Sequence, residues 1–217
     1  MNVDLAPIES RSLVDQVYRT LRGMILNGQL PARQELRQEH LATKLGVSRT
    51  PLREALNRLA SEGLVEFRPR RSAVVAEFSQ RDIEADYQAR RILEPAAARI
   101  AAERCDPATI ALLEAALRAA DGAGDDVDRQ FETNRAFHRA LVAGAGNAHL
   151  LRFSDELWSG PIAPYFYARQ ARQPNRHRRD RREHARIVGL IAAGDGEGAA
   201  RAVDAHLAAA LESLRRG

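Results

Sequence analysis

The run GVSRTPLREALNRLASEGLVEFRPRRSAVVAEF, from Gly46 to Phe78, constrains the fold of this chain more than any other segment. Gly46 supplies a tight turn between two predicted helices whose leucines recur at core spacing. The second helix begins at Ser48, a residue type that caps helix N-termini well. Two short strands, 64–67 and 73–78, then flank a turn rich in arginine. This order of elements predicts a winged helix-turn-helix, with helices at 12–27, 37–45 and 48–63.

The exposed N-terminal part of the third predicted helix carries four polar side chains: Ser48, Arg49, Thr50 and Arg53. A helix-turn-helix presents this part of the helix to base edges in the major groove of DNA. Arginine can bind guanine O6 and N7 with two hydrogen bonds, and serine or threonine can donate to phosphate. In the hairpin turn, Arg70 and Arg71 are placed for contact with phosphate or the minor groove. An ordinary amphipathic helix can also carry surface arginines, but the glycine turn and the basic hairpin favour DNA binding.

The distribution of charge agrees with this interpretation. Residues 1–78 hold 12 basic and 9 acidic side chains, whereas the rest of the chain holds 21 and 20. Most of the net charge of +4 therefore lies in the first third of the sequence, as a DNA-binding segment requires.

The sequence also indicates a compartment. Cys105 is the only cysteine, so the chain forms no intrachain disulfide. The N-terminus lacks a signal-peptide pattern, and no apolar run approaches the roughly 18 residues of a membrane span. We therefore expect a cytoplasmic protein with no membrane segment.

From Ser79 onward the apolar residues follow only a helical period. Ser79 and Asp82 resemble a capping box at the start of a long helix, in which Pro95 is expected to cause a kink. Asp106 and Pro107 pair an N-cap with an N1 proline at the start of the next helix. Helices are predicted at 79–103, 107–120, 126–143, 147–158, 164–172, 178–193 and 197–215. The fold class is therefore mainly α, with a winged helix-turn-helix domain at 8–78 and an all-helical bundle at 79–217.

Three of the six histidines fall on apolar helix faces and are expected to point into the bundle: His138, His184 and His206. Asn134 lies four residues before His138 and so shares its face. Three neutral imidazoles with one oxygen ligand suit a divalent transition metal, and an open coordination position could hold an anionic ligand. A histidine on an apolar face is also often an ordinary core residue. Spacing alone leaves both interpretations open.

Two parts of the chain resemble known protein families. The string GVSRTPLREALNRLASEGLV is similar to the helix-turn-helix of the GntR family of bacterial transcription regulators, and this resemblance covers about residues 10–78. Residues 82–210 resemble the all-helical effector domain of its FadR-type branch, called the FCD domain. The second resemblance is carried by RRILE at 90–94, NRAFH at 134–138, GN at 146–147, EH at 183–184 and DAHL at 204–207. The first implies that Arg49, Thr50 and Arg53 contact DNA, with Ser48 beside them.

The FCD resemblance implies a metal bound by His138, His184 and His206. In that family an Asp four residues before the first histidine is also a ligand; here Asn134 replaces it, and its amide oxygen is a neutral, weaker ligand. Zinc is the expected metal, with nickel or manganese as alternatives. The metal would face a pocket for a small organic acid effector, and Arg90 occupies the position of an arginine that reaches toward it. Four aromatic residues are candidates for the pocket wall or for the core: Trp158, Tyr165, Phe166 and Tyr167.

Together these patterns predict a ligand-responsive transcription regulator, expected to be a repressor, that binds a pseudopalindromic double-stranded DNA operator as a homodimer. A constitutive DNA-binding protein with a degenerate sensor is one alternative, because Asn134 weakens the metal site. A metal-dependent hydrolase is another, but it needs a general base beside the metal, and no HExxH string occurs. The seven arginines between 168 and 182 are interpreted as a loop and a solvated helix face, with a second nucleic-acid surface as the alternative.

Overall fold

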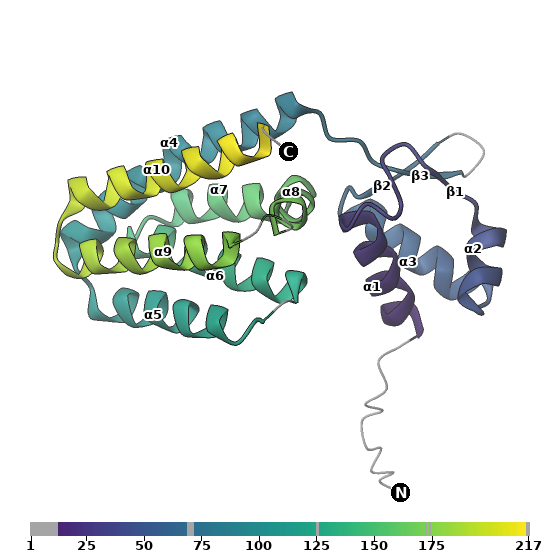
Figure 1. The fold of residues 1–217 in the computed structure, drawn as a ribbon, viewed down its shortest axis with the longest axis horizontal. Helices are drawn as coiled ribbons and strands as arrows, with labels where there is room; N and C mark the ends of the chain where they lie inside the picture. Colours follow the sequence, from purple (N-terminus) through teal and green to yellow (C-terminus); the bar gives the residue numbers. More distant parts are fainter. Residues whose placement is uncertain (1–12, 69–71, 125, 172, 174, 216–217) are drawn as a thin grey trace, which may run out of the picture. The chain divides into compact units, whose positions relative to one another are not determined.

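The computed structural model describes residues 13–68, 72–124, 126–171, 173 and 175–215. Its chain divides into two compact units, one ending at Glu77 and the other beginning at Phe78. Figure 1 shows helices and a small sheet in the first unit and a bundle of helices in the second. The division follows the last strand, where the sequence changes from the wing pattern to a helical one.

The first unit combines three helices with a three-stranded sheet. In chain order it consists of α1 (Leu13–Leu26), β1 (Glu35–Leu36), α2 (Gln38–Leu45), α3 (Arg49–Ser61), β2 (Val65–Phe67) and β3 (Ala73–Val75). Strands β1 and β2 both pair with β3 in antiparallel fashion, with Leu36 opposite Ala73 and Val65 opposite Val75. No sequence pattern predicts β1, because two residues are too few to reveal a strand period. The strand β3 is also shorter than the predicted 73–78.

A glycine in the left-handed conformation joins α2 to α3. Gly46 has a φ of 66°, its N–H donates to the Thr43 carbonyl at 3.3 Å, and the Val47 N–H donates to the Ala42 carbonyl at 3.0 Å. A side chain at this φ would be strained, so the turn favours glycine, as predicted. Ser48 follows at the N-cap position with an extended backbone, but its hydroxyl makes no capping hydrogen bond. The turn geometry, and not a serine cap, therefore sets the start of α3.

The second unit is built from seven helices and contains no strand among its described residues. The helices are α4 (Gln80–Arg104), α5 (Pro107–Asp121), α6 (Val127–Gly144), α7 (Ala148–Ser159), α8 (Ile162–Ala171), α9 (Arg176–Ala192) and α10 (Gly196–Arg215). Helix α4 lies side by side with α10, and α5 packs against α6 (Figure 1). Fully buried Phe137, Leu141 and Ile187 are among the side chains at the centre of the core.

The helix α4 begins as predicted and continues past its proline. The Ser79 hydroxyl accepts from the Asp82 N–H at 3.2 Å, and the Asp82 carboxylate accepts from the Ser79 N–H at 2.8 Å, which completes a capping box. The helix then runs through Pro95 to Arg104, so the proline does not divide it. Asp106 caps α5 by accepting from the Ala108 N–H at 3.2 Å.

These elements confirm the predicted fold class: the chain is mainly α, with a winged helix-turn-helix and an all-helical bundle. Within the described ranges, no helix combines the length and the apolar character that crossing a membrane demands.

Gly144, at the end of α6, should tolerate no side chain. A Cβ there would overlap the Thr109 Cγ2 and lie 3.1 Å from the Ala101 Cβ, so α5 or α4 would have to move. We expect Gly144→Ala to lower the free energy of unfolding of the second unit by about 1–3 kcal/mol. Trp158 is the only tryptophan and lies in this unit, so its fluorescence reports urea unfolding of the unit.

Gly189→Ala is the matched control, because Gly189 is also helical and nothing lies within 4 Å of a Cβ built on it. The free energy of unfolding of this variant should rise by up to about 1 kcal/mol, since alanine is the better helix former. Equal unfolding midpoints for the two variants would contradict the close packing of α4, α5 and α6 around Gly144.

Candidate functional site

The exposed face of α3 carries the predicted DNA-contacting side chains. Leu52, Leu56 and Leu59 have no exposed surface and fix the opposite face of the helix in the core of the first unit. Four polar side chains at the N-terminal end of the helix are exposed: Ser48, Arg49, Thr50 and Arg53. The helix thus offers two arginines and two hydroxyls to a partner, and none of them is needed for the core.

Arg49 forms an ion pair within its own unit. Its Nη2 lies 2.6 Å from the Oε1 of Glu39 on α2, and the two side chains are 70% and 77% exposed. Exposed pairs of this kind contribute about 0–1 kcal/mol, so Arg49 can exchange Glu39 for DNA at small cost. The predicted contacts Arg70 and Arg71 lie outside the described residues.

Three histidines from three helices come together inside the second unit. His138 on α6, His184 on α9 and His206 on α10 are 1%, 5% and 5% exposed, and one ring nitrogen of each lies within 4.8 Å of the others. The Nε2 atoms of His184 and His206 are 3.3 Å apart. Two nitrogens bound to one tetrahedral zinc, each at about 2.0–2.1 Å, would be separated by roughly 3.3 Å. The three predicted metal ligands therefore converge, and the His184–His206 pair has the separation that two zinc ligands would have.

Two carboxylates orient two of these rings. The Nδ1 of His138 lies 2.7 Å from the Oε2 of Glu94, and the Nδ1 of His206 lies 2.6 Å from the Oε2 of Glu183. Because an ionised carboxylate only accepts, each Nδ1 carries the proton and each Nε2 keeps its lone pair. The Nε2 of His138 is buried and has no hydrogen-bond partner among the described residues. A buried nitrogen lone pair without a hydrogen-bond donor, close to two further imidazole nitrogens, fits a metal ion.

Burial keeps at least two of these imidazoles neutral. Loss of solvent lowers the pKa of His138 to about 4 despite the opposing attraction of Glu94. It also lowers the pKa of His184 well below the ordinary value, and His206 adds to this shift. Phe137 stacks on the His184 ring with the centroids 3.9 Å apart. Since a metal binds the unprotonated nitrogen, both rings are in the binding form at neutral pH.

A buried ion pair adjoins the histidines. The Nε of Arg90 donates to the Oε1 of Glu94 at 2.7 Å, and the two side chains are 6% and 1% exposed. Burial alone would raise the pKa of the Glu94 carboxyl, but Arg90 and His138 outweigh it and hold that pKa below its ordinary value. The Arg90 guanidinium carbon also lies 4.1 Å from the centroid of the Trp158 ring. Arg90 is thus an interior residue, and its first partner is Glu94.

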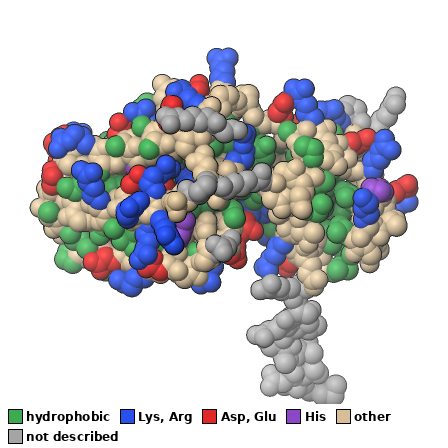
Figure 2. All heavy atoms as spheres, viewed as in Figure 1, with side chains coloured by type: hydrophobic (Ala, Val, Ile, Leu, Met, Phe, Trp, Pro, Cys, Tyr) green, Lys and Arg blue, Asp and Glu red, His purple; other side chains and the backbone are tan. Residues whose placement is uncertain are grey.

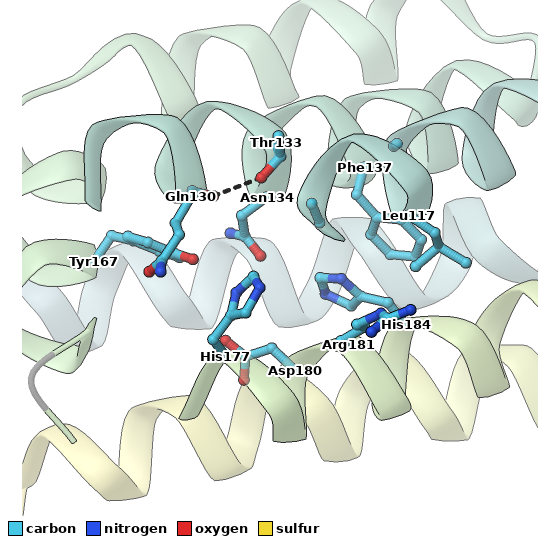
Figure 3. A pocket seen from close by; sticks show the side chains of 12 residues that line it. Leu117, Gln130, Thr133, Asn134, Phe137, Tyr167, His177, Asp180, Arg181 and His184 are labelled. Carbon is cyan, nitrogen blue, oxygen red and sulfur yellow. Dashed lines mark hydrogen bonds between the residues drawn. The ribbon is translucent and has the colours of Figure 1, made fainter. Parts of the chain in front are cut away.

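Asn134, one turn before His138 on α6, lines two small cavities. The first is also lined by His177, Asp180 and His184, and Figure 3 shows the Asn134 carboxamide pointing toward the histidines of α9. The second is also lined by His138 and His206. This position leaves the Asn134 amide oxygen as a candidate fourth ligand.

The second cavity, which we call the effector cavity after the pocket predicted beside Arg90, is lined by residues of six helices: α4, α6, α7, α8, α9 and α10. Its polar lining comprises Asp86, Arg90, Asn134, His138, Arg176 and His206. Trp158, Phe166 and Tyr167 contribute aromatic walls, whereas Tyr165 packs on Phe78 with the ring centroids 5.1 Å apart. The cavity measures about 20 Å³, which is room for about one water molecule.

Sequence reasoning assigned no role at the site to three carboxylates of this region: Asp86, Glu94 and Glu183. The one available signal was spacing, because Asp86 and Glu94 lie four residues on either side of Arg90 and share its helix face. The same spacing is common between exposed side chains. Nothing in the sequence separates the buried Asp86 and Glu94, or the partly exposed Glu183, from the many solvated carboxylates.

The arginine-rich segment is only partly solvated. Arg176, at the start of α9, is buried, and its Nε donates to the Oδ2 of Asp180 at 2.8 Å. The Nε of Arg181 lies 2.5 Å from the Oδ1 of Asp121. On the face seen in Figure 2, basic side chains of the helical unit stand among acidic ones. The described arginines of this segment therefore favour a structural role over a continuous nucleic-acid surface; Arg172 lies outside the described residues.

Two family descriptions match the chain. "Bacterial regulatory proteins, gntR family" matches residues 13–75, and "FCD domain" matches residues 85–209. The first match covers the helix-turn-helix and the wing strands, and the second covers the histidine cluster and every lining residue of the effector cavity except Ala210.

Similarity to individual proteins extends over most of the chain. The "Probable D-xylose utilization operon transcriptional repressor" of Paenarthrobacter nicotinovorans is 32% identical over 199 residues, which cover 86% of this chain and 82% of that protein. The HTH-type transcriptional regulator McbR of Escherichia coli (strain K12) is 29% identical over 191 residues, or 86% of each. A solved structure of E. coli McbR/YncC has a TM-score of 0.63 and 27% identity, covering 95% of this chain and 99% of that one. These similar proteins are named as transcription regulators.

Glu94→Gln should destabilise the second unit, because it removes the charge that balances the buried Arg90. Losing one partner of a buried ion pair costs about 3–5 kcal/mol, and we expect about 3 kcal/mol because Asp86 also attracts Arg90. Glu84→Gln is the control on the same helix. Its pair with Arg215 is 2.9 Å long but is 40% and 49% exposed, so about 0–1 kcal/mol is expected. Equal losses of unfolding free energy in the two variants, measured by urea unfolding, would contradict a role for Glu94 in organising the interior.

Proposed function

Because the chain belongs to the GntR family and carries an FCD domain, we propose that it is a ligand-responsive repressor that binds its operator as a homodimer. Family membership makes it a DNA-binding transcription regulator, like its named relatives. The response to a ligand is supported chiefly by the convergence of three buried histidine nitrogens beside a buried arginine.

On DNA, α3 would lie in the major groove with Arg49 and Arg53 toward the base edges. Ser48 and Thr50 would donate to phosphate, helped by the partial positive charge at the helix N-terminus. Arg70 and Arg71 of the wing would contact phosphate or the minor groove. Two such modules related by a twofold axis match two half-sites, so we expect a pseudopalindromic operator.

In the second unit, His138, His184 and His206 would hold a divalent transition metal, with the Asn134 amide oxygen as a fourth ligand. Zinc is the first choice for this set of nitrogen and oxygen donors, with nickel or manganese as alternatives. A bound metal would supply a Lewis-acid position for a carboxylate oxygen. Glu94 and Glu183 would keep His138 and His206 in the required tautomer.

The effector would be a small organic acid bound in the effector cavity. All four proposed ligands are neutral, so an acid anion would balance the charge of the metal, and each should favour binding of the other. Arg90 would add a second positive group on the cavity wall. The acid can change operator occupancy only by binding two forms of the protein unequally, and typical coupling of about 1–3 kcal/mol changes affinity about 5–150-fold.

Two alternative functions can be compared with the structure. A metal-dependent hydrolase would need a general base beside the metal. Glu94 and Glu183 are both engaged with histidine Nδ1 atoms, which leaves Asp86 of the effector cavity as the candidate base. Turnover of candidate acids by the purified, metal-loaded protein would support the hydrolase alternative. A constitutive DNA-binding protein with a degenerate sensor is favoured only by Asn134, and it predicts that no acid stabilises the protein.

Arg49→Ala should weaken operator binding by about 1–3 kcal/mol and relax the sequence preference at one base pair of each half-site. The measurement is a mobility-shift titration at fixed salt on an operator selected from a random duplex pool. Arg201→Ala is the matched control, because its side chain is 72% exposed against 70% for Arg49 and it removes the same charge from the other unit. Equal affinities for the two variants would reject α3 as the recognition helix.

His138→Ala should lower the zinc bound per protomer, because it removes one of three converging nitrogens. Elemental analysis after dialysis against zinc measures the content, and His149→Ala removes an exposed histidine of α7 as the control. Asn134→Asp should act in the opposite direction and raise zinc affinity, because a charged carboxylate is a stronger ligand than a neutral amide oxygen. Equal zinc in all variants would contradict the site.

A further inference from the structure

Asp86 is a buried carboxylate without a described partner. It lies on α4 one turn before Arg90, is 9% exposed, and lines the effector cavity. No hydrogen-bond donor of the described residues reaches it, although Arg90 attracts it at longer range. A buried acceptor without a donor is costly, so such groups usually face a water, an ion or a ligand.

The charge on Asp86 strengthens this argument. Burial raises the pKa of Asp86 to about 6 and Glu94 raises it further, while Arg90 opposes both. The carboxylate is therefore still largely ionised at pH 7.5. Arg90 does not neutralise it by contact, because its Nε donates to Glu94 instead. A donor placed in the cavity would satisfy the Asp86 oxygens directly.

The same cavity also presents donors that lack acceptors. Trp158 Nε1 and Arg176 Nη1 are both buried without a hydrogen-bond partner among the described residues, and both residues line the cavity. Arg176 uses its Nε on Asp180 and so keeps part of its guanidinium for another acceptor. The cavity therefore combines unpaired donors, which suit a carboxylate, with one unpaired carboxylate, which suits a donor.

We propose that the effector is a small acid that carries a hydroxyl or an ammonium group, and that Asp86 selects it by accepting a hydrogen bond from that group. The inference rests on the proposed acid-sensing function. A plain acid of the same length would leave Asp86 unpaired beside a second negative charge, so it would bind more weakly. Hydroxy acids and amino acids share the required chemistry.

The test compares two trios of acids that differ only at the second carbon: propionate, lactate and alanine, and succinate, malate and aspartate. Isothermal titration of the zinc-loaded full chain at pH 7.5 gives the six dissociation constants. In at least one trio, the hydroxyl or ammonium member should bind about tenfold or more tightly than the plain acid. If the plain acid binds as tightly as the hydroxyl and ammonium members in both trios, the inference is overturned, whereas the acid-sensing function is not.

Two variants of Asp86 test whether this residue causes the preference for acids with a hydroxyl or ammonium group. Asp86→Ala should bring the members of the trio to within about twofold of one another, whereas Glu103→Ala, which removes an exposed carboxylate of the same helix, should keep the selection. Asp86→Asn preserves the shape and an acceptor oxygen, so it guards against a folding defect. It should keep a preference for the hydroxy acid and lose a preference for the amino acid, which tells the two classes apart.

Selection that survives in Asp86→Ala overturns the role of Asp86. Absence of binding by all six acids overturns both the inference and the acid-sensing function, so the two failures are distinguishable.

Discussion

The carboxylate of Glu94 binds two partners at once inside the second unit, and the polar interior depends on that double contact. One oxygen accepts from Arg90 on the same helix, and the other accepts from His138 on α6. Taking three such groups out of water is costly, and only mutual hydrogen bonding makes the arrangement stable. The charge of Arg90 keeps Glu94 ionised, and the ionised carboxylate in turn holds the proton on the Nδ1 of His138. An arginine thereby decides which nitrogen of the histidine is left for a metal.

The second carboxylate, Glu183, repeats this arrangement at His206. Because both carboxylates face the Nδ1 side of the rings, neither is a direct ligand at the cluster of Nε2 atoms. A divalent ion at three imidazoles and an amide would therefore receive no negative charge from its own ligands, and unbalanced charge in a protein interior is expensive. An anion in the adjoining cavity would lower that cost. With Asn134 in place of the family's Asp, the proposed metal ligands are all neutral. The replacement would then favour joint binding of metal and acid, and would not be a defect of the site.

The sequence predicted what depends on local spacing and missed what depends on helix packing. Helical periodicity located the seven helices of the second unit, and the apolar faces around His138, His184 and His206 indicated that these rings point inward. Their approach to one point depends on how α6, α9 and α10 pack, which no local pattern encodes. For the same reason Asp86 and Glu94 were assigned no role at the site, since a carboxylate four residues from an arginine is usually a surface pair. The wing residues Arg70 and Arg71 and the roles assigned on α3 remain predictions.

The volume of the effector cavity explains how a ligand could act at a distance. Room for about one water molecule cannot admit an acid of three or four carbons, so binding would require side chains or helices of the six-helix wall to move. Packed helices shift between discrete arrangements more readily than they deform continuously. The acid-bound and acid-free forms would then be two packings with unequal affinity for the ligand, which is what an effector requires. Helix α4 carries Asp86 and Arg90, and only residues 76–79 separate it from β3. A shift of α4 would therefore reach the DNA-reading unit through the chain itself.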